Sequence, residues 1–171
     1  MKRFVIADTH FGHENIIKYC NRPFANAAEM DKYLIEAWNS IVGQDDVVWM
    51  LGDFALADKE KIRNLVRKLK GNKRLILGNH DHASENFYRD AGFSFVSKWP
   101  VLIDDFVILS HAPLQYMSEE CVFFNIFGHV HNDERYLDLS SAGACVSAER
   151  LNYRPVQIET IYSQLNKIRS K

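Results

Sequence analysis

The sequence is poor in cysteine, in net charge and in long apolar runs, and each shortage excludes a class of protein. Its three cysteines, Cys20, Cys121 and Cys145, are odd in number and share no short spacing. They therefore predict free thiols in a reducing compartment, and they exclude a disulfide framework or a zinc knuckle. The formal net charge is −1, so the overall charge gives no reason to expect a polyanionic partner.

Hydrophobic segments that could target or anchor the chain are also missing. No apolar run approaches the roughly 20 residues that a membrane-spanning helix needs. Only four apolar residues separate Met1-Lys2-Arg3 from Asp8, too few for a signal peptide. We therefore expect a cytoplasmic protein with no membrane partner.

The overall composition is that of an ordinary globular protein. Hydrophobic residues make up 47% of the chain and charged residues 25%, which argues against disorder. A chain of 171 residues without a repeat, linker or low-complexity segment is expected to form one domain over residues 1–171.

Five apolar runs along the chain each end in aspartate, asparagine or histidine. The clearest is Leu75-Ile76-Leu77, which leads into Gly78-Asn79-His80-Asp81. An apolar run bounded by glycine is typical of a buried strand that ends in a tight turn. The other four runs end in Asp8-Thr9-His10, Gly52-Asp53, Ser110-His111 and Gly128-His129-Val130-His131. Ligands of α/β folds bind beyond the carboxyl ends of such strands, so these side chains predict a metal site.

The order of strands and helices predicts two sheets packed face to face, with helices outside. The first half alternates strands at 3–7, 47–51 and 75–77 with helices near 14–19, 30–41, 58–69 and 84–91. The second half reads mostly as strand, at 93–96, 99–103, 106–109, 122–127, 135–139 and 153–158, before a last helix around 161–168. The helix at 58–69 and its exit are rich in lysine and arginine, which indicates either a solvated face or a weak phosphate-binding patch.

Taken in order, the polar motifs resemble the full motif set of the calcineurin-like metallophosphoesterases. The set consists of Asp8-x-His10, Gly52-Asp53, Gly78-Asn79-His80-Asp81, Ser110-His111 and Gly128-His129-x-His131. The resemblance implies an α/β fold (α+β in some schemes), a four-layer βαββ sandwich of two mixed sheets flanked by helices. It also implies hydrolysis of phosphomonoesters or phosphodiesters by a metal-bridging hydroxide.

The resemblance further implies a dinuclear metal site. One metal would be held by Asp8, His10, Asp53 and His131, and the other by Asp53, Asn79, His111 and His129, so that Asp53 bridges the two. Carboxylate, amide and imidazole ligands suit borderline metals. Manganese is the first choice, with iron, zinc, nickel or magnesium as alternatives.

His80 is the one motif imidazole left outside this ligand set, and the resemblance gives it the general-acid role toward the leaving group. Asp81 follows directly. It can orient His80 or raise the pKa of His80 through its charge, or it can serve a structural role in capping the helix that Ser84 begins.

The loop between Asp8 and Pro23 is where we expect substrate selection. Arg22 is predicted to grip a phosphate oxygen, with a salt bridge that pins the loop as its alternative. His13 is predicted to line the same pocket, with a hydrogen bond behind a metal ligand as its alternative.

Departures from better-defined branches of the family narrow the choice of substrate. Gly52-Asp53 continues into Phe54-Ala55-Leu56-Ala57, so the Asp-Arg-Gly of the protein phosphatases and the metal-binding tyrosine of the purple acid phosphatases are both missing. What remains resembles the small bacterial or phage phosphoesterases, and we expect a small phosphorylated substrate. A non-catalytic metal-binding scaffold and a nuclease are the alternatives, the nuclease being weakened by the lack of a strong basic excess. The sequence leaves the oligomeric state open.

Overall fold

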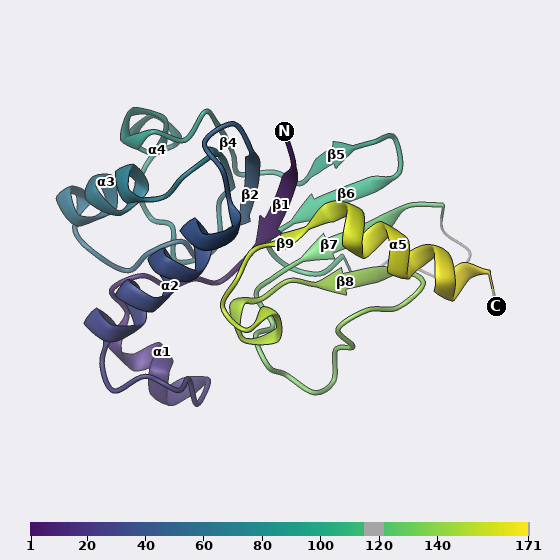
Figure 1. The fold of residues 1–171 in the computed structure, drawn as a ribbon, viewed down its shortest axis with the longest axis horizontal. Helices are drawn as coiled ribbons and strands as arrows, with labels where there is room; N and C mark the ends of the chain where they lie inside the picture. The colour runs from purple at the N-terminus through teal and green to yellow at the C-terminus, as the bar shows by residue number, and fades with distance from the viewer. Residues whose placement is uncertain (115–121, 171) are drawn as a thin grey trace.

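Two β-sheets packed face to face form the centre of the protein (Figure 1). The computed structural model describes residues 1–114 and 122–170. The first sheet has the strand order β4-β3-β2-β1-β9. Its strands β1 (Arg3–Ile6), β2 (Val47–Leu51), β3 (Asn72–Ile76) and β4 (Phe95–Ser97) run parallel, and β9 (Val156–Gln157) runs antiparallel to β1.

The second sheet has the strand order β5-β6-β7-β8. Strands β6 (Val107–Ser110), β7 (Phe124–Phe127) and β8 (Gly143–Cys145) are parallel, whereas β5 (Val101–Ile103) is antiparallel to β6. Both sheets are therefore mixed, and the fold class predicted from the sequence is confirmed.

The central strands are buried on both faces, which explains why they read as continuous apolar runs. In β1 and β2, Val5 pairs with Trp49 and faces the second sheet, whereas Ile6 pairs with Met50 and faces the helices. The parallel direction of these strands brings their carboxyl ends to one edge of the sandwich.

Three helices cover the outer face of the first sheet: α2 (Ala27–Ile41), α3 (Lys59–Lys68) and α4 (Glu85–Ala91) (Figure 1). Each begins at a side chain that accepts a hydrogen bond from the backbone three residues further on, namely Asn26, Asp58 and Ser84. The short helix α1 (Glu14–Tyr19) lies in the loop that follows β1. No helix in the described part of the chain has the length and apolarity needed to cross a membrane.

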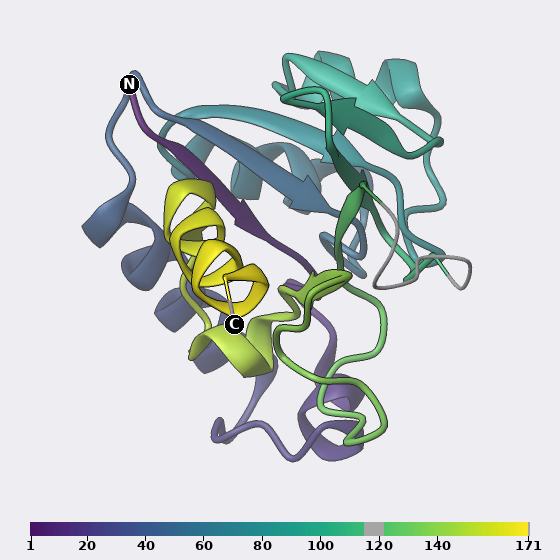
Figure 2. The same cartoon turned by 90° about the vertical axis from the view of Figure 1, so that its right-hand side faces the viewer.

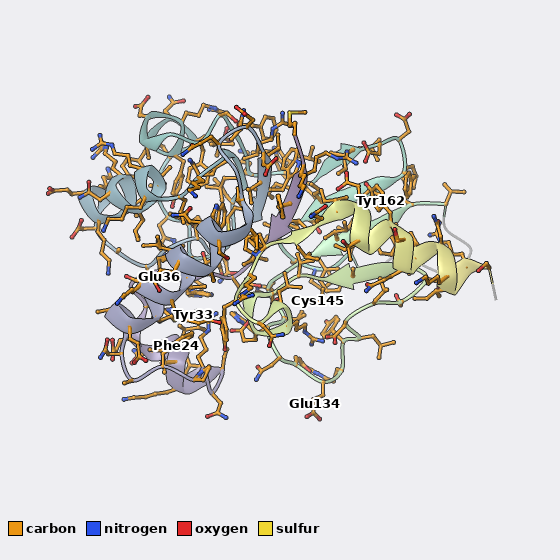
Figure 3. The ribbon with its side chains drawn as sticks, viewed as in Figure 1. Phe24, Tyr33, Glu36, Glu134, Cys145 and Tyr162 are labelled. Atoms are coloured by element: carbon orange, nitrogen blue, oxygen red, sulfur yellow. The ribbon has the colours of Figure 1, made fainter. Side chains whose placement is uncertain are left out.

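The last helix, α5 (Ile158–Arg169), differs from the expected outer layer. It lies beside β1 and β9 (Figure 2). Its Ile158, Ile161 and Leu165 belong to the core between the two sheets. Tyr162 lies on the same helix (Figure 3). Its ring packs on that of Phe106, with 5.4 Å between ring centroids. α5 therefore closes one side of the sandwich.

One strand prediction in the C-terminal part was wrong, and another was too long. Residues 135–139 are irregular apart from an isolated bridge of Leu139 to Ala144, and the Arg150 side chain donates to the carbonyls of His131, Asp133 and Tyr136 along this loop. The strand in this region is β8, whose small residues Gly143-Ala144-Cys145 carry little β signal. Of 153–158, only Val156–Gln157 is strand, and it is preceded by a 3-10 helix at Ala148–Leu151. Cys20 and Cys145 are free thiols, and Cys121 lies outside the described residues.

The packing of α5 against the two sheets can be tested by truncating Leu165, which is 2% exposed in the core between them. Leu165→Ala should lower the free energy of unfolding by about 2–5 kcal/mol, because it leaves a cavity in a packed core. Ile168→Ala on the same helix is the control: it is 37% exposed and should change stability by about 0.5 kcal/mol or less. Urea denaturation of both variants measures the difference, and equal losses would contradict the packing described.

Candidate metal centre

All seven predicted metal ligands meet at the carboxyl edge of the sandwich. Asp8 and His10 follow β1, Asp53 follows β2 and Asn79 follows β3, whereas His111 follows β6 and His129 and His131 follow β7. Backbone hydrogen bonds join the loops: the Asp8 N–H donates to Gly52 and the His10 N–H to Asp53. Both sheets therefore contribute side chains to one site.

A first group consists of Asp8, His10 and His131, whose ligand atoms lie within 4.8 Å of one another. Asp8 and His10 are 0% and 1% exposed. The Asp8 Oδ1 and His10 Nε2 atoms are buried and have no hydrogen-bond partner. Buried polar atoms without a partner are costly, and a cation bound between them removes that cost.

A second group consists of Asn79, His111 and His129. The Asn79 Oδ1 atom lies 2.9 Å from His111 Nε2 and 3.0 Å from His129 Nδ1, and these two nitrogens are 3.1 Å apart. His111 Nδ1 lies 2.8 Å from the Leu51 carbonyl, which can only accept, so this nitrogen carries the proton. The neutral ring then turns its unprotonated Nε2 atom toward Asn79 Oδ1, which is also an acceptor. A cation bound between these two atoms would give both of them a partner.

Asp53 stands between the two groups. Its Oδ2 atom lies 3.4 Å from His10 Nε2 and 3.6 Å from His111 Nε2. Its Oδ1 atom accepts a hydrogen bond from the His80 N–H at 2.8 Å. A single carboxylate oxygen thus faces both groups, whereas the other is bound to the backbone.

The electrostatics of the site favour a cation. Burial, followed by the charges of His131 and Arg22, lowers the pKa of His10 to about 2, and burial also lowers the pKa of His111. Burial raises the pKa of Asp8 to about 7. Burial lowers the pKa of His131, but contacts with Cys20, Glu149 and Asp8 together raise it to about 10. His10 and His111 are thereby held neutral, which is the form in which an imidazole binds a metal, whereas His131 would release its proton on binding one.

Five of the seven predicted ligands have left-handed backbone conformations. Their φ angles are 58° at Asp8, 50° at His10, 54° at Asp53, 72° at His129 and 47° at His131. Such conformations are uncommon outside glycine and cost of order 1–3 kcal/mol each. Their concentration at one site indicates that the fold holds these loops for function.

Two glycines permit the close approach of the ligand loops. Gly52 has a φ of 85°, and a side chain there would collide with the His111 ring. A side chain at Gly78 would fall on the Asp53 carboxylate and its backbone nitrogen. Any larger residue at Gly78 would therefore displace Asp53.

Asp81 is buried and connects two of these loops. Its carboxylate accepts from the backbone N–H groups of Asp53 (2.8 Å), Phe54 (3.1 Å) and Gly78 (2.8 Å). Burial raises the pKa of Asp81 to about 7, and the three donors oppose that rise by favouring the carboxylate. The alternative role expected for Asp81, capping α4, is wrong, because Ser84 caps that helix.

The remaining predicted residues occupy different positions. The half-buried His80 has its ring centroid 5.3 Å from that of His10 and 6.0 Å from that of His13. His13 Nδ1 lies 3.3 Å from His10 Nδ1, so His13 sits directly behind a candidate ligand, and burial lowers its pKa.

Arg22 does not offer its guanidinium to a substrate. Its side chain is 0% exposed, and it pairs with Glu149 and donates to the backbone carbonyls of Asp8 and Thr9. The expectation of a phosphate-gripping arginine is corrected to the loop-pinning salt bridge that stood as its alternative.

Glu149 was missed by sequence reasoning. It follows the unexpected strand β8, and its Oε1 atom lies 3.0 Å from His131 Nδ1 and 2.7 Å from Arg22 Nη2. Burial opposes ionisation, but His131 and Arg22 lower the pKa of Glu149 to about 2. Nothing in the local sequence Ser147-Ala148-Glu149-Arg150 pointed to this contact, which exists only in three dimensions.

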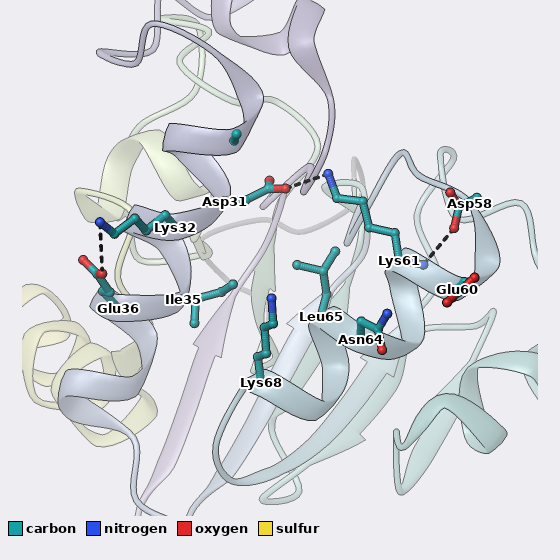
Figure 4. A pocket seen from close by; sticks show the side chains of 11 residues that line it. Asp31, Lys32, Ile35, Glu36, Asp58, Glu60, Lys61, Asn64, Leu65 and Lys68 are labelled. Atoms are coloured by element: carbon teal, nitrogen blue, oxygen red, sulfur yellow. Dashed lines mark hydrogen bonds and ion pairs between the residues drawn. The ribbon is translucent and has the colours of Figure 1, made fainter.

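A cavity of about 650 Å³ between α2 and α3 contains none of these ligands (Figure 4). Within it, the Asp31 carboxylate accepts from Lys61 Nζ at 2.8 Å and from the Gly12 N–H at 2.7 Å. The helix layer is thereby connected to the loop that carries Asp8 and His10.

Comparison with known proteins identifies the class. The model of the calcineurin-like phosphoesterase family matches residues 1–135, so the chain belongs to that family and the predicted resemblance is confirmed. An uncharacterised protein of Methanocaldococcus jannaschii is 36% identical over 174 residues, covering 97% of this chain and 92% of the relative. The gene 66 protein of Mycobacterium phage L5 is 42% identical over 78 residues, covering 44% of this chain and 37% of the phage protein.

Two solved structures share the fold. A protein of unknown function from Aquifex aeolicus superposes with a TM-score of 0.72 at 24% identity, covering 95% of this chain and 98% of that one. The nuclease MPE of Pseudomonas putida gives a TM-score of 0.52 at 20% identity, covering 75% and 61%. Members of the family bind divalent metals, and the two side-chain groups described above are the candidate ligands here.

The role of Asp81 can be tested with Asp81→Asn. The amide would turn an N–H donor toward backbone N–H donors, and a buried unpaired group costs about 1–3 kcal/mol. We expect the free energy of unfolding to fall by that amount and metal binding to weaken. Asp90→Asn, an exposed change on α4, is the control. Unchanged stability of Asp81→Asn in thermal and urea unfolding would rule out this role.

Proposed function

We propose that the protein is a dinuclear metal-dependent phosphoesterase that hydrolyses small phosphomonoesters or phosphodiesters. The observation that carries the proposal is the Asp53 Oδ2 atom, which faces both groups of acceptors at 3.4 and 3.6 Å. Membership of the calcineurin-like phosphoesterase family supports the reaction class.

The residues that would hold the metals follow from the two groups. Asp8, His10 and His131 would hold one ion, Asn79, His111 and His129 the other, and Asp53 would be shared. The donors are carboxylate, amide and imidazole, which suit manganese and other borderline or hard divalent ions. Two such ions supply the Lewis acidity that activates water and offsets charge on phosphoryl oxygens.

His80 is proposed as the general acid. It belongs to neither ligand group, yet its backbone N–H is bound to Asp53, so its position is fixed relative to the shared carboxylate. Its half-buried ring lies near His10, and the neighbouring Asn79 is exposed. A ring nitrogen there can donate the proton that a departing alkoxide needs. His13 Nδ1 lies 3.3 Å from His10 Nδ1, so His13 would position that ligand from behind.

Two other functions are weaker. A nuclease is favoured by the structural similarity to Pseudomonas putida nuclease MPE, but the formal charge of −1 gives no global attraction for nucleic acid. A non-catalytic scaffold would have no use for His80 beside the ligands.

The dinuclear proposal is tested first by the metal content of the protein. In equilibrium dialysis at saturating free Mn²⁺, elemental analysis corrected for the free ion should find two bound ions per folded chain. The loaded protein should hydrolyse at least one ester in a screen of generic mono- and diesters that also includes single-stranded DNA. One ion or none in a folded protein would sink the dinuclear proposal, and cleavage of DNA alone would favour the nuclease.

The second prediction separates His80 from the ligands. His80→Ala should keep both ions but lose about 10²–10⁴-fold in kcat on esters with poor leaving groups, because the alkoxide then leaves unprotonated. The loss should be smaller for p-nitrophenyl esters, whose leaving group needs little protonation. His82→Ala, an exposed neighbour whose ring lies 6.2 Å from that of His80, is the matched control. Equal losses on both kinds of ester would assign His80 a binding or structural role.

A further inference from the structure

A buried ion pair lies directly behind the first ligand group. The Arg22 side chain is 0% exposed and the Glu149 side chain 7% exposed. Arg22 Nε and Nη2 donate to the same Glu149 Oε1 atom at 2.9 and 2.7 Å. Neither residue belongs to the motif set of the family found in the sequence.

The pair contacts both flanks of this group. On one side, Arg22 Nη2 donates to the Asp8 carbonyl at 2.7 Å and Nη1 to the Thr9 carbonyl at 2.9 Å. On the other side, Glu149 Oε1 lies 3.0 Å from His131 Nδ1. A carboxylate bound at Nδ1 fixes the ring orientation and leaves Nε2 free to coordinate. Arg22 and Glu149 thus connect the strained loop of Asp8 to the loop of His131.

The Arg22–Glu149 pair also neutralises its own charge beside the first ligand group. An unpaired guanidinium so close to Asp8 would oppose a cation, and Glu149 offsets that charge. The cluster of Cys20, His131 and Glu149 is therefore no separate cation site, since Arg22 already provides the positive charge beside Glu149.

Among the described residues, no buried ion pair supports the second group. Asn79 and His129 are exposed, and the contacts that hold the group involve the backbone: His111 Nδ1 lies 2.8 Å from the Leu51 carbonyl, and the His129 N–H donates to Asp8 Oδ2 at 2.8 Å. It also has no carboxylate of its own and shares Asp53 with the first group, which has Asp8 in addition. Burial, ligand charge and preorganisation all favour the first group.

We propose that the Arg22–Glu149 pair is a brace that makes the Asp8/His10/His131 site the tighter of the two metal sites, and that the Asn79/His111/His129 site exchanges its ion with solution. Glu149 and Arg22 act as positioning residues. The inference rests on the metal-binding part of the proposed function, and at limiting metal the protein would carry a single ion.

The experiment is a Mn²⁺ titration of the metal-stripped full chain, followed by calorimetry and by the electron paramagnetic resonance signal of free Mn²⁺. The wild-type protein should show one tight and one weak site. Glu149→Gln should weaken the tight site about 10–100-fold and leave the weak site unchanged. Asn79→Ala should do the reverse. Glu159→Gln is the matched control. It removes the glutamate that pairs with Arg3 at the start of β1, at the end of the strand away from both ligand groups.

Arg22→Lys separates the brace from a substrate-binding role and does not depend on the glutamine variant being folded. A lysine ammonium cannot bond Glu149 twice and also reach the carbonyls of Asp8 and Thr9. The brace predicts a weaker tight site in this variant. Unchanged Mn²⁺ binding with a raised KM would overturn it.

Other results would also overturn the inference: two equivalent sites in the wild-type protein, or equal weakening of both sites in Glu149→Gln. Failure of the proposed function is distinguishable. A protein that binds Mn²⁺ in the expected pattern but hydrolyses no ester would keep the brace and lose the phosphoesterase, whereas active protein with equivalent sites would do the opposite.

Discussion

The arrangement of the whole edge depends on the position of one carboxylate, Asp53. Its two oxygens have different tasks, since Oδ1 is bound by the His80 backbone and Oδ2 faces two sets of acceptors. To bring it there, Gly52 adopts a left-handed conformation, Gly78 leaves room for the carboxylate, and Asp81 holds the backbone of the loop from below. A neutral or displaced residue at this position would leave a cluster of buried imidazoles and oxygens with no common partner.

Much of this could be predicted from the sequence, for a physical reason. Parallel strands buried on both faces are continuous apolar runs, and the polar residues that interrupt them at the carboxyl end must lie at the same edge of the sheet. The runs before Asp8, Asp53, Asn79, His111 and His129 therefore indicated that polar side chains cluster at one edge, and the family resemblance selected seven of them as ligands. Helix starts at Asp58 and Ser84 were readable because capping is a local interaction.

What the sequence did not reveal depends on contacts between distant residues. Strand β8 is made of small residues, and Gly143 is required because a side chain there would meet the Asn125 carbonyl. Glu149 follows that strand and touches Arg22, 127 positions earlier, so no local pattern announces it. The same contact explains why Arg22 was misassigned: a guanidinium beside a predicted phosphate site is equally suited to a buried carboxylate.

The proposed ligands come from both halves of the sandwich: Asp8, His10, Asp53 and Asn79 from the five-stranded sheet, and His111, His129 and His131 from the four-stranded one. Ions bound between them would therefore hold the two sheets together at this edge. Because unfolded chains do not assemble such a site, each tenfold rise in free metal above the dissociation constant adds about 1.4 kcal/mol per ion to the folded state. The supply of metal would then set the equilibrium stability of the folded protein as well as the occupancy of its site.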